Sequence, residues 1–196
     1  MTRACCLVRT ICYSLLLLIS SEMSARADIG VPMIFVTLPS MLIALIPIIL
    51  IESFCLSRRL NADPTSTIKP VAIANVISTL VGIPITWLLL VLVQMLTGGG
   101  GANGIETTKQ RFLAVTWQAP WLIPYESDLS WMIPAATLVL LVPFFFASWQ
   151  IEVQVVKKLM KESPSADVAK GMFLANVVSY LLLGIIALCT LLKAIR

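Results

Sequence analysis

Long stretches of apolar residues alternate with short polar segments along this chain, and the spacing of charged residues measures their length. Four stretches contain 23, 36, 23 and 22 uncharged residues: Asp28 to Glu52, Lys69 to Glu106, Asp128 to Glu152 and Lys170 to Lys193. A helix needs about 20 residues to cross the hydrocarbon core of a bilayer, because each residue adds about 1.5 Å across about 30 Å. The pattern therefore predicts an all-α membrane protein with four transmembrane helices, over Val31–Leu56, Pro70–Leu96, Trp131–Val156 and Val168–Leu192.

A shorter apolar stretch near the start of the chain has the three parts of a secretory signal. Arg3 and Arg9 are basic, Ile11–Ile19 is apolar, and Ala25-Arg26-Ala27 offers small residues for cleavage. This order predicts a signal peptide over residues 1–27, cleaved after Ala27. The alternative is an uncleaved anchor helix.

Polar positions of the first half recur in the same order in the second half, which indicates an internal repeat. The counterparts of Glu52, Arg58, Pro64, Lys69 and Ala74–Ser78 are Glu152, Lys158, Pro164, Lys170 and Ala175–Ser179. Each unit crosses the membrane twice, so the second unit enters in the same orientation as the first. We therefore expect two parallel, non-inverted helical hairpins, residues 28–97 and 131–196, in a four-helix bundle with a pseudo-twofold axis along the membrane normal.

Basic residues predict the orientation of these hairpins. The short connections 58–69 and 157–170 carry more Lys and Arg than Asp and Glu, whereas the long connection 98–130 does not. By the positive-inside rule, the short connections are cytoplasmic, and the long connection and both mature termini are external. The expected location is the cell membrane, that is, a plasma or inner membrane.

The long connection contains two contrasting segments. Gly98–Gly101 begins it, a composition typical of flexible linkers. Phe112–Tyr125 follows, short, aromatic and interrupted by prolines, and this composition favours a segment at the membrane interface. Its role is either an aromatic anchor or an external lid or partner-binding surface.

Composition agrees with a membrane protein and offers little chemistry for catalysis. Of 196 residues, 59% are hydrophobic and 12% charged, and mean hydropathy is +0.96, whereas soluble domains are about 25% charged. There is no histidine, no metal-ligand spacing among the five cysteines, and no phosphate-binding glycine loop. We therefore expect no enzyme activity, no cofactor or metal, and no nucleic-acid partner.

Polar side chains within the predicted spans are the candidate functional residues. Glu52 and Asn75 each lie six residues from a basic residue of the first short connection, so both lie about 9 Å inward on adjacent helices. The same holds for Glu152 and Asn176 in the second hairpin. Each hairpin can therefore close one Glu–Asn hydrogen bond, which satisfies groups that are costly to expose to lipid.

This candidate intramembrane polar site has two interpretations. Its members are Glu52, Asn75, Ser78, Glu152, Asn176 and Ser179. They are either structural, fixing each hairpin, or a cation or proton site, since intramembrane carboxylates are often functional.

Small residues at four-residue spacing predict how the hairpins meet. Ala74, Ser78 and Gly82 form such a row, and Ala175 and Ser179 begin the same row in the second hairpin. Such rows allow close helix approach. We expect helices 70–96 and 168–192 to meet near the pseudo-twofold axis, unless the row contacts a second copy of the chain.

The sequence thus indicates a multi-pass membrane protein whose activity it does not specify. The leading hypothesis is a structural or accessory membrane component that contacts the lipid bilayer and other membrane proteins, or a second copy of itself. The alternative is a small transporter or channel for a cation or proton that uses the repeated Glu and Asn residues.

Overall fold

The computed structural model describes residues 33–97, 104–116 and 128–196, with side chains of the first range described from Met41 onward. The predicted signal peptide, the Gly98–Gly101 segment and residues 117–127 of the aromatic segment lie outside the described residues.

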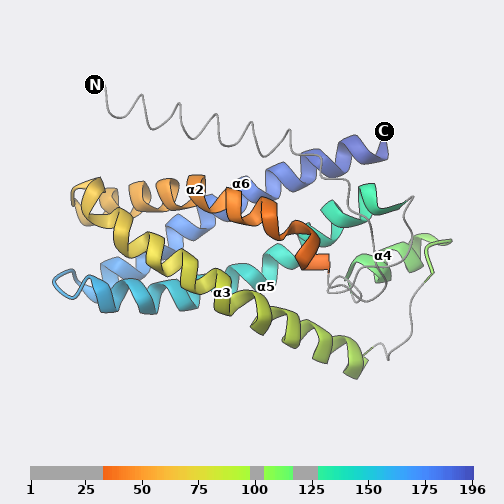
Figure 1. The fold of residues 1–196 in the computed structure, drawn as a ribbon, viewed down its shortest axis with the longest axis horizontal. Coiled ribbons are helices and arrows are strands. Elements are labelled where there is room, and N and C mark those ends of the chain that lie inside the picture. The colour runs from red at the N-terminus through yellow and green to blue at the C-terminus, as the bar shows by residue number, and fades with distance from the viewer. Residues whose placement is uncertain (1–32, 98–103, 117–127) are drawn as a thin grey trace.

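The regular secondary structure of these ranges is all helical. They form α2 (Met33–Leu60), α3 (Pro64–Thr97), α4 (Thr108–Thr116), α5 (Leu129–Leu159) and α6 (Ser165–Ile195), with no strand among them (Figure 1). By length and composition, α2, α3, α5 and α6 are each able to cross a membrane. The expectation of an all-helical chain with four apolar spans is confirmed.

The long helices extend beyond the apolar stretches that predicted them. At the first short connection, α2 continues to Leu60 and α3 begins at Pro64. The Asp63 carboxylate accepts the Thr65 backbone N–H at 3.1 Å, which satisfies a donor left free in the first turn. Proline suits this turn because its missing N–H is not needed there. The apolar stretch therefore predicts only the apolar part of each helix, whereas capping residues in the connections determine where the helix begins and ends.

The short helix α4 was not predicted, although its start has a sequence signal. Gln110 Oε1 accepts the backbone N–H of Thr107 at 2.9 Å, and Thr107 Oγ1 accepts the N–H of Gln110 at 3.3 Å. This reciprocal Thr-x-x-Gln pairing is a capping box. Ala114 and Val115 then pack with Met132 of α5, and this contact places α4 against the bundle.

The four long helices form a ring in which each contacts two neighbours. α2 packs on α3 and α5 on α6 within the hairpins, while α3 packs on α5 and α2 on α6 between them. The expectation that the helices now labelled α3 and α6 meet at the axis is wrong, because these two are diagonal. The row of small residues on α3 instead approaches α5: a Cβ on Gly82 would lie 3.8 Å from Ile151 Cδ1.

The bundle is tightly packed at the end with the short connections. A cluster of side chains with 0% exposure fills this end, and we call it the apolar plug: Leu56, Val71, Ala74, Val156, Val168 and Met172. Gly171 of α6 brings its backbone so close to α2 that an added Cβ would lie 2.7 Å from Leu56 Cδ1. Close packing therefore closes the bundle at this end.

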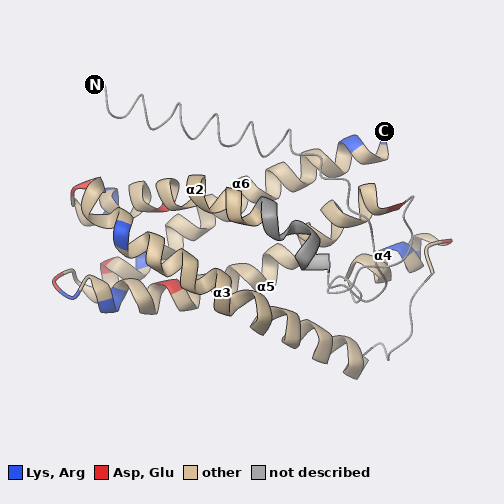
Figure 2. Cartoon of the chain, in the orientation of Figure 1, with Lys and Arg blue, Asp and Glu red and all other residues tan. Residues whose placement is uncertain are grey.

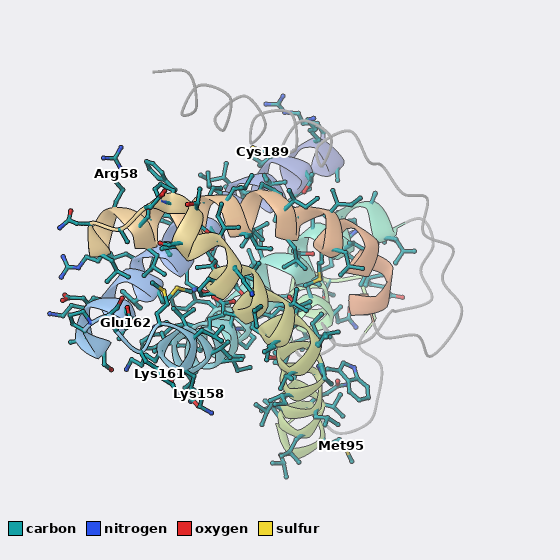
Figure 3. The ribbon with its side chains drawn as sticks, turned by 60° about the vertical axis from the view of Figure 1, so that its left-hand side comes forward. Arg58, Met95, Lys158, Lys161, Glu162 and Cys189 are labelled. Atoms are coloured by element: carbon teal, nitrogen blue, oxygen red, sulfur yellow. The ribbon has the colours of Figure 1, made fainter. Side chains whose placement is uncertain are left out.

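Charged residues gather outside the apolar plug. Lys and Arg residues lie along the end with the short connections (Figure 2), and Arg58, Lys158 and Lys161 are among them (Figure 3). Arg59 of α2 pairs with Asp167 of α6 at 3.5 Å, with both side chains more than 40% exposed. This ion pair is a surface contact between the hairpins.

The opposite end of the bundle is more open. The second half of α3 diverges from the other helices (Figure 1), and Met95 lies near its far end (Figure 3). Its exposed side chains are large and apolar: Leu88, Leu89, Leu92, Val93, Met95 and Leu96. In a bilayer such a surface suits lipid or an apolar partner.

Candidate functional site

The two Glu–Asn hydrogen bonds expected from the sequence are present. Asn75 Nδ2 donates to Glu52 Oε2 at 2.7 Å, and Asn176 Nδ2 donates to Glu152 Oε2 at 2.7 Å. Each Asn nitrogen also donates to a backbone carbonyl one turn earlier in its own helix, at 3.1 Å. Two acceptors at each nitrogen fix which amide atom is nitrogen and which is oxygen.

The serines of the candidate site make a second set of bonds, which join the two hairpins. Ser179 Oγ of α6 lies 2.7 Å from Glu52 Oε1 of α2, and Ser78 Oγ of α3 lies 2.7 Å from Glu152 Oε1 of α5. Each carboxyl group therefore has one amide partner from its own hairpin and one hydroxyl partner from the other. We call the six residues the polar clasp: Glu52, Asn75, Ser78, Glu152, Asn176 and Ser179. None is more than 3% exposed.

The serine hydroxyls have a second neighbour within hydrogen-bond distance. Ser78 Oγ lies 3.0 Å from the backbone carbonyl of Asn75, and Ser179 Oγ lies 3.1 Å from that of Asn176. A hydroxyl carries one proton and can accept through two lone pairs. Each serine can thus donate to the carboxyl or to the backbone, but not fully to both.

A cavity of about 100 Å³ adjoins the polar clasp on the side away from the apolar plug. Its polar lining comes from all four long helices: Glu52, Asn75, Ser78, Thr79, Ser148, Glu152 and Tyr180. Apolar residues form the rest, including Leu45, Ile83, Leu141 and Phe144. One water occupies about 30 Å³ of the liquid, so the cavity has room for several. We call it the clasp cavity.

Ser148 and Tyr180 are residues of this region that sequence reasoning missed. Ser148 Oγ lies 3.3 Å from Ser78 Oγ, and Tyr180 lines the clasp cavity. The position equivalent to Ser148 in the first half is Ile48, so the repeat gave no reason to select it. The position equivalent to Tyr180 in the first half is Thr79, which also lines the cavity. Because the two residues differ in type, the repeat did not select them.

The oxygen atoms of both clasp amides lack a hydrogen-bond partner. Asn176 Oδ1 is fully enclosed and has no donor, and the hydrogen bonds of Asn75 are made by its nitrogen. Asn75 is 3% exposed and lines the clasp cavity. Its amide oxygen is therefore a free acceptor beside the Glu52 carboxyl group.

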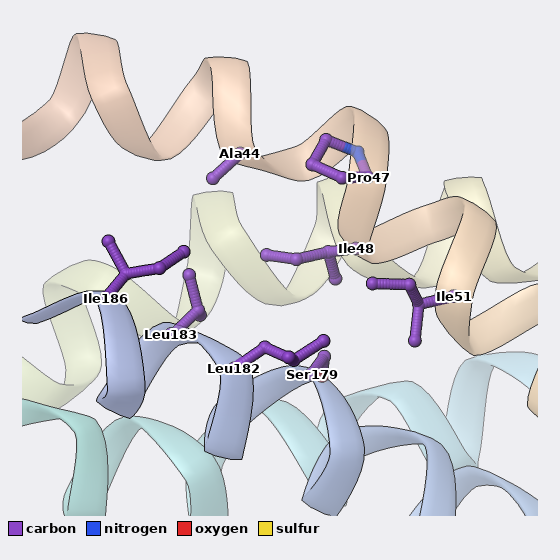
Figure 4. Close-up of a pocket in the computed structure, with 8 residues that line it drawn as sticks. All are labelled: Ala44, Pro47, Ile48, Ile51, Ser179, Leu182, Leu183 and Ile186. Atoms are coloured by element: carbon purple, nitrogen blue, oxygen red, sulfur yellow. The ribbon is translucent and has the colours of Figure 1, made fainter. Parts of the chain in front are cut away.

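A second, smaller cavity lies between α2 and α6 (Figure 4). It has a volume of about 10 Å³ and lies beside Pro47, between Ala44, Ile51 and Leu182 (Figure 4). Its lining is almost wholly apolar, and Ser179 is its one polar neighbour. A space of this size and character is a packing gap rather than a ligand site.

Metal-ligating clusters are absent from the described ranges. No group of three or more His, Cys, Asp or Glu side chains there is placed to hold a metal ion, and Cys55 and Cys189 are free thiols. The polar clasp contributes two carboxyl groups among amide and hydroxyl groups. Such a set of groups can form hydrogen bonds and, when a carboxyl group is ionised, can bind a positive charge.

Comparisons of this chain with protein-family models, curated proteins and solved structures found no match. Its function is therefore inferred from its own residues.

Proposed function

We propose that the chain is a non-enzymatic, multi-pass component of a cell membrane that acts through contacts with other membrane proteins. Two parallel repeat hairpins, 28–97 and 131–196, form its frame after a signal peptide over 1–27. The observation that carries this proposal is the reciprocal pattern of the polar clasp, in which each hairpin donates one serine hydroxyl to the carboxyl group of the other. Buried polar groups used in this way hold two hairpins in one arrangement, and the outer faces stay apolar for lipid or a partner.

The proposed orientation places the short connections in the cytoplasm and the long connection outside. More of the described Lys and Arg residues lie at the end with the short connections than at the opposite end, which supports this orientation (Figure 2). Reporter fusions at Ala62 and Ser165 should read as cytoplasmic, and a fusion at Gly101 should read as external. Any reversed reading contradicts the orientation.

The accessory role is tested by purification of the tagged, full-length chain in mild detergent. A partner that acts with this protein should co-purify in constant proportion and should be lost when Leu89 and Leu92, exposed on α3, are both changed to Ala. The matched control changes Leu181 and Leu188, exposed on α6, to Ala. Purification of the chain alone under these conditions contradicts the accessory role.

A transporter or channel for a proton or cation is the second candidate, and the clasp cavity favours it. Two carboxyl groups from different hairpins border this cavity. If they carry ions, the double variant Glu52→Gln, Glu152→Gln should abolish flux in proteoliposomes while remaining folded. Equal flux in the wild type and the double variant excludes transport through the clasp.

A further inference from the structure

Glu52 and Glu152 are enclosed carboxyl groups without a basic partner. Each is 1% exposed, and no Lys or Arg of the described ranges forms an ion pair with either. An ionised carboxylate in an apolar interior is costly unless a positive charge or several donors compensate it. A positively charged species is therefore the class of ligand that matches this pair.

The serine hydroxyl groups of the clasp can hydrogen-bond to a carboxyl group in both its ionised and its protonated form, so the positively charged species can be a proton. When a carboxyl group is ionised, its serine donates to Oε1 across 2.7 Å. When the carboxyl group is protonated, its O–H donates to the serine Oγ, and the serine donates instead to the backbone carbonyl at 3.0 or 3.1 Å. The carboxyl group and the serine hydroxyl are hydrogen-bonded in both states, and rotation of the serine hydroxyl is the only rearrangement that must accompany gain or loss of the proton.

The free oxygen of Asn75 indicates how a proton reaches the pair. Asn75 as a residue is 3% exposed, and its side chain lines a cavity with room for water and adjoins Glu52. Buried water typically occupies such sites, where several polar groups surround a free acceptor. A water molecule that donates to Asn75 Oδ1 would lie beside the carboxyl groups.

Other titratable groups near the pair come from two helices. They are Cys55 of α2 and Tyr180 of α6, which both lie within electrostatic reach of the carboxyl groups. From α3 the clasp cavity receives only amide, hydroxyl and apolar side chains, and from α5 its one titratable group is Glu152 itself. Neither Cys55 nor Tyr180 supplies a positive charge.

Access is blocked on one side of the pair. The apolar plug lies between the clasp and the short connections, and its side chains are fully enclosed. Gly171 allows α6 to approach Leu56 closely in the same layer. Water can therefore approach the carboxyl groups through the clasp cavity and not through the plug.

We propose that Glu52 and Glu152 form a proton-binding pair that exchanges protons with water in the clasp cavity, on the side away from the apolar plug. A hydronium ion transfers its proton to Oε1 of one carboxylate, and neutral water remains. The new O–H bond then donates to serine Oγ, and release follows the reverse path. The role of this pair in the cell rests on the second candidate function, transport. Proton binding is measured separately from flux. Binding without flux would exclude transport and leave the proton-binding pair standing.

Infrared difference spectroscopy of the full-length protein in lipid vesicles tests this proposal. A protonated carboxyl group has a C=O stretch separate from the bands of a carboxylate. At mildly acidic pH the wild type should show this band, and D₂O should shift it because water reaches the pair. The band should weaken in Glu52→Gln and in Glu152→Gln and disappear in the double variant. Glu162→Gln, an exposed change near the second short connection, is the matched control and should keep it.

Three results would overturn the proposal. They are a wild type without the band at mildly acidic pH, a band that persists in the double variant, and a band that appears only after Na⁺ and K⁺ are removed. The last result would assign the site to a metal cation. If the Gln variants fail to fold, Ser78→Ala and Ser179→Ala replace them, and each should change the frequency of the band because its hydrogen-bond partner is lost. An unchanged frequency in both contradicts the proposal.

Discussion

Ser179 Oγ lies 2.7 Å from Glu52 Oε1, although 127 residues separate the two along the chain. This contact joins the last long helix to the first, and its counterpart from Ser78 to Glu152 joins the two middle ones. The two hairpins are therefore connected at one level by a pair of equivalent bonds. Their removal should affect how the hairpins hold together more than how each one forms.

Ser78→Ala and Ser179→Ala should each lower the melting temperature in detergent, by a loss of about 1–2 kcal/mol of stability. Ser179→Ala removes one bond between hairpins and Ser78→Ala removes two, and each change leaves a carboxyl oxygen without its hydroxyl partner. The control is Thr190→Val, since Thr190 bonds only to carbonyls of its own helix. In a double-mutant cycle, Ser179→Ala and Glu52→Gln should be coupled and Ser179→Ala and Thr190→Val additive. Full additivity in the first cycle contradicts the importance of this bond.

Asn75→Ala and Asn176→Ala should destabilise the protein by about 1–3 kcal/mol each, because a buried carboxyl oxygen loses its amide donor. The loss should be similar at both positions, since both amides make the same pair of bonds. Gln154→Ala changes an exposed amide two residues from Glu152 and should stay within about 0.5 kcal/mol. Thermal unfolding followed by circular dichroism measures all three. Equal melting points for Asn75→Ala and Gln154→Ala would show that the clasp amide is dispensable.

Gly171→Val should destabilise the bundle by about 1–3 kcal/mol through overpacking. The first added carbon would already lie 2.7 Å from Leu56 Cδ1, and Leu56 is fully enclosed, so it has little room to move. Gly184→Val is the control, because the nearest atom to its added Cβ, Leu141 Cδ1, lies at 3.8 Å. Melting temperatures of the two variants should differ clearly. A smaller loss at Gly171 than at Gly184 would contradict tight packing in the plug.

Arg59→Ala and Asp167→Ala should have small effects, although they break the ion pair between α2 and α6. Both side chains are more than 40% exposed and 3.5 Å apart, and exposed pairs contribute roughly 0.2–1 kcal/mol. The difference from wild type should shrink further in high salt. A loss larger than that of Ser179→Ala would mean that the surface pair, rather than the clasp, holds the hairpins together.

The spans and the Glu–Asn hydrogen bonds of the clasp are predictable from the sequence. Apolar length is a direct requirement of the bilayer, so four spans followed from the spacing of charges. The Glu52–Asn75 bond followed from depth, because two residues equally far from one connection lie side by side in a hairpin. Local geometry within one hairpin was sufficient for both.

Predicting the hydrogen bonds between the hairpins would have required knowing which helices are neighbours. Ser78 and Ser179 were selected by the repeat, but their partners depend on the ring order of the helices. The row of small residues Ala74, Ser78 and Gly82 predicted a close approach of α3 to another helix. The structure shows that this helix is α5, which the row alone did not indicate. The position equivalent to Ser148 in the first half is the apolar Ile48, so the repeat did not distinguish Ser148 from other serines.

The single level of the polar clasp also has a mechanical consequence. The hydrogen bonds that Ser78 and Ser179 make between the hairpins all lie at one level, next to the apolar plug. Two hairpins that are joined at one level, and closely packed on one side of it, can tilt relative to each other about that level. A small tilt there becomes a large displacement at the far ends, where α3 already stands apart from the bundle (Figure 1). The clasp and the plug thus constrain the bundle at one level, and a tilt of one hairpin against the other would displace the far ends most.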